Sequence, residues 1–292
     1  MNRDELFEQI QRKRSFLCVG LDTDFTKIPE FIVDKLKKNR QTEDHVTLLS
    51  IIEFNKQIID ATAQYAVAYK PNLAFYEAYG SPGIAALQET CRHIHREHPN
   101  IFIIADAKRG DIGNTSDLYA RAFLGGGNRG IFDAVTLSPY MGRDSADAFF
   151  KYEDKWAVIL ALTSNKSADD FETLKLENGG PLWKEVLRKA STWGGEKTLD
   201  NTMFVVGATR AETLREVREI VPDHFLLVPG VGAQRGSLAE VAANGMNSKC
   251  GLLVNSSRGI IYADSTERFA EAAAEEARKM QTEMAALLDR YL

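Results

Sequence analysis

The segment DAKRGDIGNT, residues 106–115, places Asp106, Lys108, Arg109 and Asp111 within six residues, directly after the apolar run IFIIA. Charged groups are costly to bury unless they are paired, so charged side chains at the end of a buried strand indicate a functional site. A lysine held between carboxylates can act as a general acid, and a lysine can also form a Schiff base with a carbonyl substrate. The segment is therefore the first candidate for catalysis.

Composition and charge limit the class of protein. The chain has 292 residues, 44% hydrophobic and 26% charged, which is typical of a soluble globular protein. Its net charge of −5 and its short basic runs at 12–14 and 35–38 argue against nucleic-acid binding. The charged start and the lack of a long apolar run predict a cytoplasmic protein with no membrane partner. Three scattered cysteines, Cys18, Cys91 and Cys250, predict reduced buried thiols.

Short apolar runs alternate with amphipathic segments such as residues 46–64, 81–97 and 210–221. This alternation predicts a (β/α)8 TIM barrel, formed by a single domain over 1–292, with an enlarged surface excursion at about 164–202. A doubly wound open sheet has the same alternation, but the count of eight runs favours the barrel. The predicted strands are 16–22, 66–72, 101–108, 134–139, 157–163, 203–209, 225–231 and 251–257.

The chemistry of such a barrel lies at the carboxyl ends of its strands. Strand alternation puts Asp106 and Lys108 on one face, with Lys70 on the neighbouring strand, so a Lys–Asp–Lys cluster is expected at the barrel mouth. An ion-pair network that only stabilises the barrel is the alternative. The predicted strand ends carry Asp22, Lys70 with Asn72, Asp106 with Lys108, Thr136 with Ser138, Ser164, Thr209, Gly230 with Gly232, and residues 255–258.

Two glycine-containing loops follow the seventh and eighth predicted strands. They are PGVGAQRG at 229–236 and NSSRG at 255–259. Barrels often bind phosphate at these two loops through backbone N–H groups. A phosphate site is therefore expected, and two ordinary turns are the alternative.

Two further patterns are interpreted structurally. GGGNRG at 125–130 follows a predicted helix and precedes a strand, the reverse of a dinucleotide-binding motif, so it predicts a helix end and a turn. Cys91, His95 and His98 have spacings that could bind a metal. Because Cys91 continues an apolar helical stripe, we predict no metal site there.

DAKRGDIGNT resembles the D-x-K-x-x-D-I-x-N-T signature of the orotidine 5′-phosphate decarboxylases, in its bacterial form. The likeness continues through VGLD, YKPN, SPYMG, TSNKS, PGVGAQ and NSSRG, over nearly the whole chain. It implies a decarboxylase of pyrimidine biosynthesis that converts orotidine 5′-phosphate to uridine 5′-phosphate. It also implies that the enzyme has no cofactor and no metal, and that it is a homodimer of barrels with shared active sites.

The resemblance further implies a role for each residue of the charged segment. Lys108 would protonate C6 of the pyrimidine as carbon dioxide leaves. Asp106 would press against the substrate carboxylate, and Lys70 would bridge the aspartates and the ribose. Asp111 would reach into the active site of the partner subunit.

Substrate contacts are implied in the same way. Asp22 and Thr115 resemble ribose contacts, the latter acting across the dimer, while Ser164 would contact the amide edge of the pyrimidine. Gln234 and Arg258 would hold the phosphate. Compared with better-known members, the segment after the seventh strand is short and the 164–202 segment is large.

Two other functions are weighed against this one. A barrel aldolase or isomerase would use Lys108 or Lys70 as a Schiff base, and borohydride would trap its substrate adduct. A non-catalytic nucleotide-binding barrel would bind uridine 5′-phosphate and leave orotidine 5′-phosphate unchanged.

Overall fold

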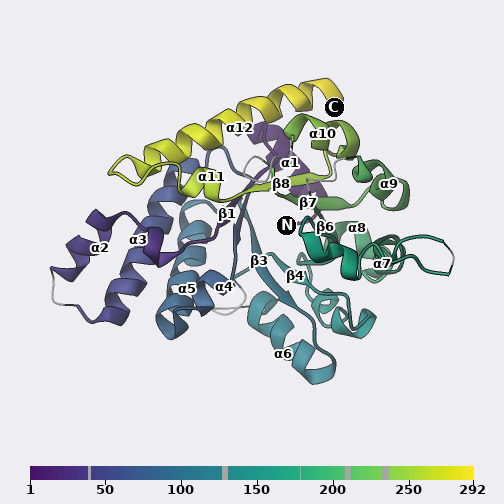
Figure 1. Cartoon of the computed structure of the whole chain (residues 1–292), viewed down its shortest axis with the longest axis horizontal. Helices are drawn as coiled ribbons and strands as arrows, with labels where there is room; N and C mark the ends of the chain where they lie inside the picture. The colour runs from purple at the N-terminus through teal and green to yellow at the C-terminus, as the bar shows by residue number, and fades with distance from the viewer. Residues whose placement is uncertain (39–40, 127–130, 178, 208–211, 232–236) are drawn as a thin grey trace.

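Eight parallel strands form a closed barrel in chain order, and β1 pairs with β8 to close it. The computed structural model describes residues 1–38, 41–126, 131–177, 179–207, 212–231 and 237–292 (Figure 1). The closed barrel confirms the predicted fold and excludes the open sheet. The strands are β1 (Leu17–Leu21), β2 (Ala68–Pro71), β3 (Phe102–Arg109), β4 (Ala134–Leu137), β5 (Trp156–Leu162), β6 (Thr202–Val206), β7 (Phe225–Pro229) and β8 (Leu252–Ser256).

Helices surround the strands (Figure 1). The predicted helical segments correspond to α3, α5 and α9, with ends that differ by a few residues; residues 210–211 lie outside the described part of the chain. The helices are α1 (Arg3–Lys13), α2 (Glu30–Lys37), α3 (Glu43–Thr62), α4 (Ala74–Glu77), α5 (Gly80–Glu97), α6 (Gly113–Leu124), α7 (Leu182–Ala190), α8 (Thr198–Asn201), α9 (Thr213–Ile220), α10 (Leu238–Gly245), α11 (Arg258–Ile261) and α12 (Phe269–Tyr291).

Local sequence accounts for these elements. The strands read as continuous apolar runs because both faces are covered, and all five residues of β1 are buried. Helix α1 begins with a capping box, in which the Asn2 side chain accepts from the N–H of Glu5 and the Glu5 carboxylate accepts from the N–H of Asn2. Helix α7 buries Trp183, Leu187 and Ala190, a spacing of three to four residues that lies on one helix face.

The 164–202 segment contains α7, which lies between β5 and β6, together with α8 and a short 3₁₀ helix at Lys166–Asp170. Its first part is fastened to the end of β5. The Glu172 carboxylate accepts from the N–H and the hydroxyl of Thr163, each at 2.7 Å. This contact fixes the start of the segment at the barrel mouth.

Helix α6 ends at Leu124 with Gly125 as its C-cap, so the GGGNRG motif begins as a helix end. Residues 127–130 of that motif lie outside the described part of the chain. Within the described ranges, none of the helices has both the length and the apolar character needed to cross a membrane.

A buried basic cluster lies where β7 begins. The Arg218 guanidinium donates to the backbone carbonyls of Val221, His224 and Gly251. The His224 ring is buried beside Phe204. Burial, together with the guanidinium groups of Arg218 and Arg3, lowers the pKa of His224 from 6.5 to about 4.

This pKa predicts an acid-sensitive contribution to stability. Below pH 6.5 the unfolded imidazole takes up a proton that the folded state binds only near pH 4, so stability falls with decreasing pH by about 1.4 kcal/mol per unit. We expect wild type to lose about 2 kcal/mol more than His224→Gln between about pH 6.5 and pH 5. Urea unfolding of both proteins at each pH checks this. Parallel pH dependences would contradict it.

Candidate active site

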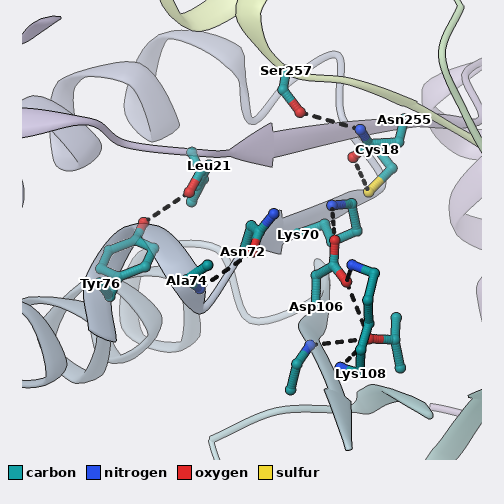
Figure 2. A network of polar contacts seen from close by, with 12 residues as sticks. Cys18, Leu21, Lys70, Asn72, Ala74, Tyr76, Asp106, Lys108, Asn255 and Ser257 are labelled. Carbon is teal, nitrogen blue, oxygen red and sulfur yellow. Dashed lines mark hydrogen bonds and ion pairs between the residues drawn. The ribbon is translucent and has the colours of Figure 1, made fainter. Parts of the chain in front are cut away.

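The carboxyl ends of β2 and β3 bring two lysines to one aspartate (Figure 2). Lys70 Nζ lies 2.8 Å from Asp106 Oδ2, and Lys108 Nζ lies 2.5 Å from Asp106 Oδ1. Lys70 is buried, whereas the Lys108 side chain is 51% exposed at the mouth of the barrel. One ammonium is thus enclosed by protein, and the other is open to an incoming ligand.

The cluster keeps its charges despite burial. Burial opposes the charge on Lys70, but the carboxylates of Asp106 and Asp22 outweigh it and raise the pKa of Lys70. Burial likewise opposes the charge on Asp106, but Lys70 and Lys108 lower its pKa to about 2. At neutral pH Asp106 is therefore an anion and Lys70 a cation.

Strand β3 departs from regular geometry within this cluster. Lys108 has φ of +47°, in the left-handed region that a lysine seldom adopts, and the pairing of β3 with β4 shifts between Ala105 and Arg109. Simple alternation therefore does not explain why Asp106 and Lys108 converge. Thr136 on β4 donates a hydrogen bond to Asp106 at 3.1 Å. The sequence placed Thr136 at a strand end but gave no sign of this contact.

A pocket opens beside the cluster at the ends of β1, β2, β3, β7 and β8. Asp22 lies in its wall, and Asp22 Oδ1 is buried and has no hydrogen-bond partner among the described residues. A buried oxygen without a partner is unfavourable in the free protein, which makes it a candidate ligand contact. The lining residues are Asp22, Lys70, Asn72, Asp106, Pro229, Gly230, Val231, Asn255, Ser256, Ser257 and Arg258.

Ser164 follows β5, and its Oγ is also buried with no hydrogen-bond partner in the part of the chain that the structure describes. The hydroxyl lies against Gly207 at the end of β6, where an added Cβ would come within 1.9 Å of it. Only glycine leaves room for Ser164 there.

The predicted phosphate loops are described in part. Gly230, with φ of +97°, and the exposed Arg258 both line the pocket. Gln234 lies outside the described residues, as do Gly232 and Thr209. Of the two residues predicted to hold the phosphate, only Arg258 lies among the described residues.

Asp111 and Thr115 are not joined to the cluster. Asp111 accepts from the N–H of Ile112 at 2.7 Å, and within the described ranges it forms no ion pair with Lys70 or Lys108. Thr115 lies on α6 and is partly exposed. The segments that follow β3, β4 and β5 carry large exposed apolar side chains, of which Tyr140 and Phe171 contact each other. We name them the exposed apolar patch: Ile112, Leu118, Tyr140, Met141 and Phe171.

The residues considered for a metal do not converge. Cys91 is buried, and His95 contacts the carbonyl of Ile131 at 2.8 Å. His98 instead lies beside Asp60 and His93, and these three are the one group in the described part of the chain whose donor atoms are close enough for a metal ion. They lie where α3 and α5 lead into the starts of β2 and β3, at the opposite end of the barrel from Lys108.

Comparison with known proteins identifies the family of the chain. The orotidine 5′-phosphate decarboxylase / HUMPS family matches residues 15–273. The orotidine 5′-phosphate decarboxylase of Phocaeicola vulgatus is 54% identical over 284 residues, which are 97% of this chain and 98% of that protein. That of Flavobacterium johnsoniae is 54% identical over 289 residues, 99% of each chain.

The chain is also similar to a solved structure. The OMP decarboxylase of Leishmania donovani has a TM-score of 0.75 and 34% sequence identity, covering 97% of this chain and 99% of that chain. The match extends over the strands that carry Lys70, Asp106 and Lys108. The chain therefore belongs to the orotidine 5′-phosphate decarboxylase / HUMPS family.

Proposed function

We propose that the protein converts orotidine 5′-phosphate to uridine 5′-phosphate and carbon dioxide, with Lys108 as the proton donor. The observation that carries this proposal is the pair of ammonium groups on Asp106: Lys70 is buried and lines the pocket, and Lys108 is exposed at the mouth of the barrel. The membership of the family supplies the substrate.

The reaction needs a positively charged group beside one carbon atom, C6 of the pyrimidine. When the bond from C6 to the carboxylate breaks, the electron pair stays on C6, and no carbonyl is placed to accept it through the ring. A fixed ammonium beside C6 stabilises this charge more in the transition state than in the ground state. Lys108 then gives its proton to C6. Because Lys108 supplies both the charge and the proton, the scheme contains no metal or cofactor.

Asp106 has two roles in this mechanism. Its carboxylate holds Lys70 and Lys108 in place and keeps Lys70 charged. It also places an anion next to the carboxylate that leaves, which disfavours the bound substrate relative to the transition state.

The rest of the substrate would satisfy the free polar groups of the site. Asp22 Oδ1 would accept from a ribose hydroxyl, and Ser164 Oγ would contact the pyrimidine amide. Arg258 would hold the phosphate, with Gln234 as its partner in the proposal. Binding energy from the phosphate can then drive desolvation at the distant pyrimidine.

We place Asp111 and Thr115 in the site of a partner subunit. Two observations support a homodimer with shared sites: Asp111 has no ion pair with the lysines of its own chain, in the described residues, and the exposed apolar patch includes its neighbour in the chain, Ile112. Patches of this kind often mark protein–protein interfaces. A cytoplasmic location is part of the proposal, supported by three buried cysteines without disulfides.

A Schiff-base aldolase that uses Lys70 fits the site less well. Its lysine must be a neutral amine to attack a carbonyl. Asp106 and Asp22 raise the pKa of Lys70, which keeps it protonated. A binding protein without activity would not need the left-handed backbone at Lys108, which costs free energy.

Lys108→Ala is the direct test of the proton donor. We expect turnover to fall by about 100-fold or more, because the lysine acts on a charge that exists only along the reaction path. Affinity for uridine 5′-phosphate should be largely kept. The loss of orotate absorbance measures turnover, and calorimetric titration measures product binding.

The control is Lys279→Ala, which removes an exposed lysine paired with Glu276 on α12. We expect normal turnover from this variant. If the cluster only stabilised the barrel, Lys108→Ala would lower the melting temperature and leave turnover near normal, which would refute the assignment.

The shared site predicts complementation between two inactive variants. Lys108→Ala and Asp111→Asn chains are unfolded together in equal amounts and refolded. Each mixed dimer then has one site with both lesions and one intact site, and random pairing makes about half of the dimers mixed. We expect about a quarter of wild-type activity to return.

Each variant refolded alone is the control and should stay inactive. Mass spectrometry of the intact dimers verifies that mixed dimers form. If Asp111 acts in its own subunit, every site keeps one lesion. No recovery in the presence of mixed dimers would therefore rule out the shared site.

A further inference from the structure

The irregular part of β3 lies opposite a single residue of β4. Ala105 pairs with Val135 and Arg109 pairs with Leu137, so four steps along β3 correspond to two along β4. The three residues 106–108 therefore face Thr136 alone. They include the aspartate and the lysine that we propose for catalysis.

The Thr136 hydroxyl contacts all three of these residues. It accepts from the N–H of Ala107 at 3.0 Å and from the N–H of Lys108 at 2.9 Å, and it donates to Asp106 Oδ1 at 3.1 Å. A threonine hydroxyl has one donor and two acceptor positions, so its capacity is filled. Thr136 is buried, and no solvent competes for these bonds.

The backbone of Lys108 needs such support. A φ of +47° is unfavourable for a residue with a side chain and persists only where the surroundings enforce it. The two N–H groups that Thr136 holds belong to the two successive peptide bonds that lead into Lys108. The same hydroxyl fixes one oxygen of the Asp106 carboxylate, to which the Lys108 ammonium is bound. Both ends of the Lys108 side chain are thereby located by one side chain on another strand.

We propose that Thr136 is a positioning residue, which sets where the Lys108 ammonium lies by holding the irregular part of β3. This inference rests on the proposed role of Lys108. Thr136 does not line the pocket described above, so its effect is expected on the rate of the chemical step and not on product binding. A displacement of about 1 Å in a catalytic group can cost about 100-fold in rate.

Thr136→Val is the main variant, because valine keeps the β-branched shape and removes the hydroxyl. We expect kcat to fall by about 10- to 100-fold, with the affinity for uridine 5′-phosphate changed by less than about twofold. Thr136→Ser restores the hydroxyl and should recover most of kcat. Both are measured by the loss of orotate absorbance and by calorimetric titration.

Thr202→Val is the matched control. Thr202 is also buried and also on a strand, but it lies at the start of β6, where its hydroxyl donates to Asn201. We expect a similar loss of thermal stability and a normal kcat. An equal loss of kcat in Thr136→Val and Thr202→Val would show that the effect is general destabilisation, and would overturn the proposal.

The pH dependence of kcat distinguishes a displaced Lys108 ammonium from a changed protonation state of Asp106. Losing the hydroxyl donor raises the pKa of Asp106, but from a value of about 2, so the carboxylate stays ionised at neutral pH. The loss of kcat in Thr136→Val should therefore be constant between about pH 6 and pH 8. A loss that disappears at high pH would indicate a protonation effect and refute a positioning role.

If Thr136→Val fails to fold, Thr136→Ala, which also removes the hydroxyl, tests the same point together with Thr136→Ser. Wild-type kcat in the valine or alanine variant would overturn the inference. Lys108→Ala, assayed in parallel, keeps the two proposals distinguishable. If Lys108→Ala retains turnover, the proposed role of Lys108 is wrong. If Lys108→Ala is inactive and Thr136→Val is fully active, only the proposed role of Thr136 is wrong.

Discussion

The burial of the Lys70 ammonium is the constraint on which the site depends. A buried cation without a partner would lose its proton or destabilise the barrel, and Asp106 prevents both. Because Asp106 is itself largely buried, its second oxygen requires a further positive group, and Lys108 is that group. Each charge thus requires the next, and the last one is exposed where a ligand can reach it.

Much of the fold could be predicted from the sequence, because a barrel strand covered on both faces is a continuous apolar run. The runs ending at Asp22 and Lys108 are examples. The ends of the strands were less accurate: β2 was predicted over 66–72 and spans Ala68–Pro71. Strand ends are set by pairing with neighbouring strands, and the apolar run alone does not contain that information.

The sequence predicted which residue types form the site, but it predicted their geometry only in part. Asp106 and Lys108 converge as expected, but through an irregular β3 and not through regular alternation. That irregularity depends on Thr136, about thirty residues away in the chain, and no local pattern shows such a contact. In the same way His98 contacts Asp60, so the spacing of Cys91, His95 and His98 did not identify its partners.

Two contacts of Glu172 organise the 164–202 segment: its carboxylate accepts from Thr163, and its backbone carbonyl accepts from the N–H of Trp183 on α7. Residues 163–172 are closed into a short loop that includes Ser164, so this loop moves with the end of β5. The N–H of Leu182 donates to the carbonyl of Leu174, so the two ends of the stretch between them are joined, and insertions or deletions within that stretch change the outer surface and leave Glu172 in place. The length of that stretch can therefore vary during evolution independently of Ser164, the residue that we propose contacts the pyrimidine.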